Sequence, residues 1–253
     1  MSVATEAGFF GSETEPRFEV AFVDGTGKHQ RRSLRSCVTE RFEDVQPVRP
    51  FRWSRGDRHF SGWYWAATVD RHVGYESWLE RDRLILLDFD PLVTGMASQP
   101  FWLHWHDGER ERRHAPDYFV RRQDGSALVV DVRADERIEP KDAAAYEVTR
   151  GACGRAGWEF ERVGTPAPVL MANVRWLSRY RHSRCFREDV ATALRTVFAS
   201  PCPLLEGARL AGETLVTLPV LFHLIWRHEL AADLSGHLLG PATQVRPGPE
   251  IGR

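Results

Sequence analysis

The sequence has little of what defines small secreted, zinc-finger or membrane proteins. Its four cysteines are scattered and include no Cys-x-x-Cys pair, which argues against a zinc knuckle or a disulfide framework and fits a reducing compartment. It has no apolar run of about 18 residues, and its first residues, MSVATEAGFFGSETEP, lack the pattern of a signal peptide. We therefore expect a cytoplasmic protein with no membrane partner.

The chain also lacks an excess of positive charge. Its 253 residues carry a formal net charge of −1, so the whole molecule is not a polycation, and any binding to DNA must come from local patches. With 42% hydrophobic residues, the chain can bury a sizeable core in one large domain or two smaller ones. It contains no internal repeat.

Hydrophobic periodicity predicts an α/β protein. Alternating runs on both sides of the sequence DGTG predict a hairpin. The segment 45–70 mixes arginines with aromatic residues and leaves two interpretations open, an irregular layer that covers a sheet or a surface that contacts the DNA backbone. From Tyr75, helical spacing predicts a helix that stops near Asp90 and Pro91.

A run of strands and a second helix should follow. Strands are expected at VTGMAS, FWLHWHD, HAPDYFVRR and ALVVDVRA, then an Ala-rich helix that ends at Gly157, then a strand at EFERVG. A helix over VLMANVRWLSRYRH leads into three further helices and a hairpin, which suggests a winged-helix-like module. The expected parts are a disordered tail at 1–16, a hairpin and covering segment at 17–70, an α/β core at 71–168, a connecting helix at 169–184, a winged-helix-like domain at 185–245 and a loose tail at 246–253.

Acidic residues in two successive strands suggest a catalytic site. Asp117 opens one strand, and Asp131 and Arg133 share one side of the next apolar strand. If the turn RQDGSA makes these strands antiparallel neighbours, the two carboxylates converge, and they repel each other unless a cation separates them. Mg²⁺ suits such a pair, and Arg133 can hold a phosphate or a developing negative charge.

The predicted helix offers a third acid. Glu76 and Glu80 are four residues apart and would share one helical face. They could instead form a solvated face, with Glu80 paired to Arg81 or Arg83. A helix glutamate, a Pro-Asp strand and an Asp-x-Arg strand follow the order expected of a metal-dependent nuclease core.

These motifs resemble the endonuclease subunit of heteromeric transposases, the TnsA family of the restriction-endonuclease-like PD-(D/E)xK superfamily. The resemblance is carried by YESWLERDRLILLDFDPLV, SQPFWL, HAPDYFV and LVVDVR in that order, and it covers roughly residues 70–180. It implies a central mixed sheet flanked by helices, followed by a C-terminal helical, winged-helix-like domain.

The resemblance also implies roles for individual residues. The family's helix glutamate falls on Glu80, with Glu76 as the second candidate, and its metal-binding aspartate falls on Asp117. The acidic or amide position of the last motif falls on Asp131, and its basic position falls on Arg133. A lysine is typical at that last position, and arginine is a poor proton acceptor, which puts the catalytic rate in doubt.

The implied activity is hydrolysis of the 5′ strands at the ends of a mobile element. Glu80, Asp117 and Asp131 would bind Mg²⁺, for which Mn²⁺ could substitute, and the partners would be double-stranded DNA, an integrase-like transposase subunit and a transposition ATPase. Two alternatives stay open: a non-catalytic DNA-binding adaptor of the same complex, and a stand-alone restriction or repair nuclease.

Four further residues are candidates for contacts with substrate. His114 lies three residues before Asp117, and Arg112 and Arg113 flank the expected site, where they either grip phosphates or form a solvated loop. Gln99, in the motif SQPF, either forms hydrogen bonds with backbone near the site or ends a strand.

Overall fold

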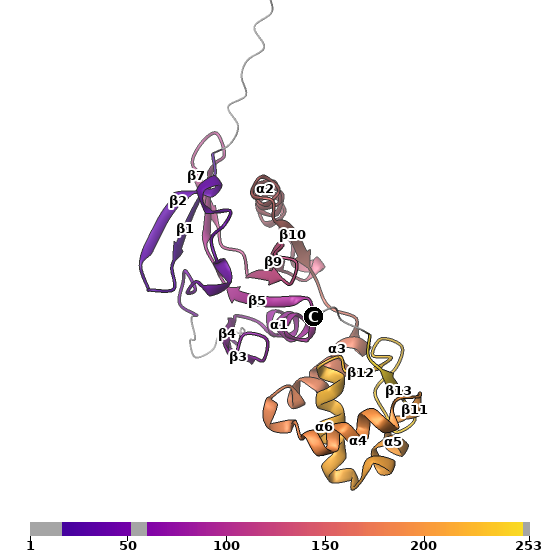
Figure 1. The fold of residues 1–253 in the computed structure, drawn as a ribbon. Helices are drawn as coiled ribbons and strands as arrows, with labels where there is room; N and C mark the ends of the chain where they lie inside the picture. Colours follow the sequence, from indigo (N-terminus) through magenta and orange to yellow (C-terminus); the bar gives the residue numbers. More distant parts are fainter. Residues whose placement is uncertain (1–16, 52–59, 250–253) are drawn as a thin grey trace, which may run out of the picture.

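The computed structural model describes residues 17–51 and 60–249, which form a mixed α/β structure with several small sheets and a helical C-terminal part (Figure 1). The disordered tail predicted at 1–16 lies outside the described residues. So do residues 52–59 of the segment rich in arginine and aromatic residues and the end of the predicted loose tail, residues 250–253.

The central sheet has four strands in the order β10-β9-β8-β5. Strand β8 is antiparallel to both of its neighbours, whereas β9 and β10 are parallel and are joined through helix α2. In Figure 1, α2 and α1 lie on opposite sides of these strands. The elements are α1 (Trp78–Phe89), β5 (Val93–Ser98), β8 (Tyr118–Arg122), β9 (Ala127–Val132), α2 (Pro140–Ala156) and β10 (Glu159–Val163).

A second, antiparallel sheet has the order β2-β1-β6-β7. Its strands are β1 (Glu19–Val23), β2 (His29–Ser33), β6 (Trp102–His106) and β7 (Glu111–His114). The hairpin predicted around DGTG is confirmed: it joins β1 to β2, and the Asp24 carboxylate accepts the Thr26 and Lys28 N–H groups in its turn.

The single strand predicted over HAPDYFVRR is wrong. His114 ends β7 in one sheet, and β8 begins at Tyr118 in the other. Pro116 has no N–H group to donate to a sheet, so the chain can leave one sheet for the other at this point. Asp117 therefore lies immediately before a strand rather than within it.

The helix predicted from Tyr75 also begins later than expected. Tyr75 ends the hairpin of β3 (Gly62–Ala66) and β4 (Arg71–Tyr75). Helix α1 begins at Trp78, and its N-cap, Ser77, accepts the Glu80 N–H through its side chain. Glu76 therefore precedes the helix, and the expectation that Glu76 and Glu80 share a helical face is wrong.

Apolar residues pack on both faces of the central sheet. On one face, Val120, Leu128 and Val130 join a cluster that includes Leu84 of α1 and Leu221 in the C-terminal part. On the other face, Phe119 and Val129 pack with Phe42, Trp158 and residues of β1. Phe42 lies in a short 3₁₀ segment, Phe42–Asp44, so the N-terminal part of the chain is built into the core.

The C-terminal part contains the helices predicted from the sequence, but the connecting helix predicted at 169–184 ends at Leu177, and two short 3₁₀ segments follow it. Its three-stranded sheet has the order β11-β13-β12. The elements are α3 (Pro168–Leu177), α4 (Glu188–Val197), β11 (Cys202–Pro203), α5 (Leu204–Ala211), α6 (Thr214–Trp226), β12 (Leu230–Ala232) and β13 (Gln244–Pro247). Strand β11 was not predicted, and β13 runs into the tail predicted to be loose from residue 246.

Within the described residues, no single helix is long and apolar enough to span a bilayer. Helices α5 and α6 meet the criteria of length and composition only as a pair, and they are bent by 119° relative to each other. Most residues in the second half of α6 are buried in the hydrophobic core.

Candidate functional site

Asp117 and Asp131 face each other at one end of the β8–β9 pair. Tyr118 lies opposite Val130 in this antiparallel ladder, and the same register, continued by one residue, places Asp117 opposite Asp131. One Asp117 carboxylate oxygen accepts the Val132 N–H at 2.7 Å. The structure thus brings together the two carboxylates that the strand pattern predicts to converge.

Glu80 approaches the pair from the start of α1. Its carboxylate accepts the Glu76 N–H at 2.7 Å and the Ser77 hydroxyl at 2.8 Å, an arrangement close to a capping box. The interpretation of Glu80 as part of a solvated face is wrong, because Arg81 pairs with Asp82 and Arg83 with Glu161. The Glu80 side chain is instead held at the N-terminus of α1, close to Asp117.

The electrostatics of these carboxylates reflect their burial and their closeness to one another. Burial raises the pKa of Asp117 well above its ordinary value, and the negative charges of Glu80 and Asp131 raise it further. Burial likewise raises the pKa of Glu80, and the neighbouring charge of Glu76 adds to the effect. Carboxylates crowded in this way favour either protonation or a bound cation.

His114 holds Asp131 from the end of β7. Its Nε2 atom lies 2.8 Å from one Asp131 carboxylate oxygen and 3.0 Å from the other, and its ring packs edge-on against Tyr146 of α2. Burial and the charge of Asp131 raise the pKa of Tyr146 to about 12. The sequence predicts His114 near the site, and the structure places it directly on a candidate metal ligand.

Arg133 does not take the place expected of a site cation. It follows the last residue of β9, Nη2 lies 3.3 Å from an Asp142 carboxylate oxygen, and Nε donates to the Arg137 carbonyl at 3.2 Å. The guanidinium is thus held at the N-terminus of α2, where Asp142 forms part of the capping box. The predicted catalytic contact of Arg133 has no support in these interactions.

The two arginines of β7 also have partners within the protein. Arg112 pairs with Asp107, and the Arg113 guanidinium lies over the Trp102 ring, 4.3 Å from its centroid. Both lie in a strand rather than in the loop that the sequence suggested. Whether they contact DNA stays a prediction.

Sequence reasoning missed Arg49, an arginine whose charge acts on the acids. Its Nη2 atom lies 2.6 Å from a Glu76 carboxylate oxygen, and its positive charge lowers the pKa of both Glu80 and Asp117 against the effect of burial. The only signal in the sequence was the mixture of arginine and aromatic residues in segment 45–70.

Gln99 links three segments at this edge of the sheet. Its N–H donates to the Asp117 carbonyl at 2.8 Å, and its carbonyl accepts the Val48 N–H at 3.0 Å. Both suggested roles are thus met by its backbone, because it also directly follows β5. The residue is 2% exposed, and neither side-chain amide atom has a hydrogen-bond partner among the described residues.

The carboxylates do not form a ready-made cage of three ligands. In the part of the chain that the structure describes, no group of three or more His, Cys, Asp or Glu side chains is arranged to hold a metal ion. The hydrogen bonds explain this, because Glu80 is turned to the start of α1 and Asp131 to His114. A bound ion would have to compete with these contacts.

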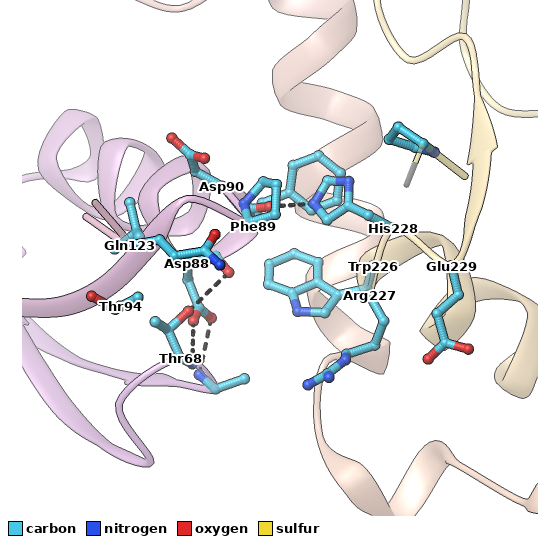
Figure 2. Close-up of a pocket in the computed structure, with 14 residues that line it drawn as sticks. Thr68, Asp88, Phe89, Asp90, Thr94, Gln123, Trp226, Arg227, His228 and Glu229 are labelled. Carbon is cyan, nitrogen blue, oxygen red and sulfur yellow. Dashed lines mark hydrogen bonds between the residues drawn. The ribbon is translucent and has the colours of Figure 1, made fainter. Parts of the chain in front are cut away.

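A separate cavity lies between the end of α1 and the turn after α6 (Figure 2). It measures about 650 Å³ and is lined by Thr68, Asp88, Asp90, Trp226, Arg227 and His228, among others. Its polar groups form structural hydrogen bonds within the protein. Asp88 accepts the Tyr64 hydroxyl and the Ala67 and Thr68 N–H groups. His228 Nε2 donates to the Phe89 carbonyl at 2.6 Å. This cavity lies between the central sheet region and the C-terminal part, and none of the three acids lines it.

Comparison with known proteins adds no relative: no protein-family model matches the chain, and no curated protein is significantly similar to it.

Proposed function

We propose that this protein is the Mg²⁺-dependent endonuclease subunit of a heteromeric transposase and that it hydrolyses the 5′ strands at the ends of a mobile element. The observation that carries the proposal is that Asp117 and Asp131 face each other at one edge of a small mixed sheet, with Glu80 nearby at the start of α1. The raised pKa of Asp117 is consistent with it, because burial is the main cause of the shift and the charges of Glu80 and Asp131 add to it.

The order of elements supports a restriction-endonuclease-like core. Helix α1, strands β5, β8 and β9, helix α2 and strand β10 follow one another, with the β6–β7 hairpin as an insertion (Figure 1). The C-terminal order helix, strand, helix, helix, strand, strand, from α4 to β13, supports a winged-helix-like domain. Fold does not define function, so the proposal depends on the acids.

The donor set suits Mg²⁺. This ion usually binds through one or two carboxylates, and water and phosphate oxygens complete its coordination, so the facing pair Asp117 and Asp131 is sufficient and Glu80 adds a third oxygen donor nearby. When bound, the ion would lower the pKa of a coordinated water and neutralise negative charge on the phosphate. His114 would keep the Asp131 carboxylate oriented, as hydrogen-bonded outer residues commonly do.

The reaction itself is a hydrolysis. The water oxygen forms a bond to phosphorus, the bond from phosphorus to the 3′ oxygen breaks, and the proton lost by the water is balanced by one gained at the leaving oxygen. The protein side chains hold the reacting groups in line, which is most of what catalysis of phosphate chemistry requires.

One observation favours the non-catalytic adaptor as a second candidate. Arg133 is held by Asp142 and by the Arg137 carbonyl instead of facing the acids. In that case the core would position DNA and recruit the transposase subunit and the ATPase without cutting.

Strand-specific nicking separates these functions. A duplex that carries an element end, labelled on each strand in turn, is incubated with the protein, the transposase subunit and the ATPase in Mg²⁺ or in EDTA. We expect a nick in the 5′ strand only with Mg²⁺. Binding without any nick in Mg²⁺ or Mn²⁺ would support the adaptor, and equal cutting without the partners would support a stand-alone nuclease.

A further inference from the structure

A chain of backbone hydrogen bonds fixes the position of Arg49 beside the acidic site. The Val48 N–H donates to the Gln99 carbonyl, and the Gln99 N–H donates to the Asp117 carbonyl. These two hydrogen bonds place Arg49, the residue after Val48, at the sheet edge where Asp117 lies. Pro50 follows, and a residue before proline is restricted to extended conformations, so the backbone of Arg49 has little freedom.

The contacts of the Arg49 side chain within the described residues leave some of its hydrogen-bond donors without a partner. Nη2 lies 2.6 Å from the Glu76 carboxylate, while 40% of the side chain remains exposed. Its Nε is buried and has no hydrogen-bond partner among the residues that the structure describes. Buried donors without partners are unfavourable and rare in folded proteins. An arginine offers five donors in a planar fork that matches the oxygens of a phosphate.

We propose that Arg49, rather than Arg133, is the catalytic cation that contacts the scissile phosphate. This inference rests on the proposed nuclease function. In the free protein, Arg49 is the counter-ion of Glu76 and of the acids around it. When the ion and the DNA occupy the site, its guanidinium donates to the non-bridging oxygens of the phosphate and neutralises the charge that develops there.

The contacts of the two arginines explain this assignment. Arg133 is tied to Asp142 and to the Arg137 carbonyl at the start of α2. Arg49 pairs with Glu76, which directly precedes the N-cap of α1 and whose N–H donates to the Glu80 carboxylate at 2.7 Å. A metal ion bound by these acids would take over part of the role of Arg49 as counter-ion and release it toward the substrate.

Two readouts test the assignment, one of which does not depend on cleavage. For Arg49→Ala we expect Mg²⁺-dependent cleavage to fall by about 10²- to 10³-fold, as when one preorganised donor is removed. Mn²⁺ binding to the free protein, measured by electron paramagnetic resonance, should tighten, because a competing positive charge is gone. Arg49→Gln is the second variant, which can keep a hydrogen bond to Glu76, and it should show the same two changes.

Two comparisons make the test specific. Arg49→Lys should retain more cleavage than Arg49→Ala but less than the wild type, because an ammonium group cannot make the bidentate contact of a guanidinium with a phosphate. Arg31→Ala is the matched control: Arg31 pairs with Glu19 and Glu111 in the N-terminal sheet, and its loss should change neither readout. Circular dichroism shows whether each variant is folded.

The possible failures are distinguishable. If the wild type nicks DNA and the Arg49→Ala and Arg49→Gln variants nick it equally well, or if their Mn²⁺ affinity is unchanged or weaker, the assignment of Arg49 is wrong and the nuclease function stands. If the wild type neither binds Mn²⁺ nor nicks DNA with its partners present, the proposed function fails and the assignment fails with it.

Discussion

Asp117→Asn is expected to abolish Mg²⁺-dependent cleavage, with a loss of about 10³-fold or more. The substitution removes the charge of the carboxylate that faces Asp131, while the amide oxygen can still accept the Val132 N–H. The fold should therefore survive. Nicking of labelled DNA by wild type and variant, in the presence of the partner subunits, measures the effect, and undiminished nicking by the variant would refute the site.

The same variant should be more stable than the wild type at neutral pH. Because the pKa of Asp117 is raised in the folded protein, its ionisation destabilises the fold, and the loss is greatest at any pH above the raised value. As the pH falls below the raised pKa, this disadvantage shrinks, and it disappears only when the pH reaches the ordinary pKa of an aspartate in the unfolded chain. Urea unfolding over a pH series should show a stability difference that is largest at neutral pH and narrows on acidification.

Asp124→Asn provides the control for this pH dependence. Asp124 is exposed in the β8–β9 turn, and hydrogen bonds from Ser126 lower its pKa. The variant should therefore gain no stability at neutral pH. A similar gain in both variants would indicate a general effect of removing negative charge rather than crowding at the site.

Phe42→Ala should destabilise the protein by about 3–5 kcal/mol, the usual range for deleting a buried phenylalanine side chain. The Phe42 ring is fully buried. It contacts four aromatic rings, with centroid distances of 5.1 Å to Phe22, 4.9 Å to Phe101, 5.5 Å to Phe119 and 5.5 Å to Trp158. Chemical denaturation measures the loss, and Phe42→Leu, which keeps more of the buried volume, should lose less.

The effect of Phe42 should extend to the site. Phe42 anchors the segment that leads to Val48 and Arg49, and this segment is linked to Asp117 through the backbone of Gln99. We therefore expect cleavage by Phe42→Ala to fall even under conditions where the protein remains folded. A loss of less than about 1 kcal/mol would mean that the N-terminal segment is not part of the core, since such small values are typical of surface positions.

Local patterns in the sequence were enough to predict much of the fold. Helix α2 ends at Gly157, which has a φ of 72°, as expected of a glycine after a helix C-terminus. The convergence of Asp117 and Asp131 followed from strand alternation and one turn. The start of α1 was misplaced because the apolar spacing extends back to Tyr75, although Ser77 and Glu80 carry the capping-box spacing that marks the true start.

Contacts between distant residues could not be predicted. Arg133 shares a strand face with Asp131 by alternation, yet its guanidinium is held by Asp142 of the following helix. Arg49 and Glu76 are separated by 27 residues in the chain, and no local pattern pairs them. The side-chain partners of charged residues depend on the tertiary structure, so sequence spacing indicated where the acids meet but not which arginine meets them.

The most direct test of this account is a crystal structure with Mn²⁺, located by its anomalous scattering. We predict an ion in contact with carboxylate oxygens of Asp117 and Asp131, with Glu80 nearby and Arg49 at the open side. A structure at saturating Mn²⁺ in which Asp131 remains bound only to His114, and no ion lies between the two aspartates, would contradict it.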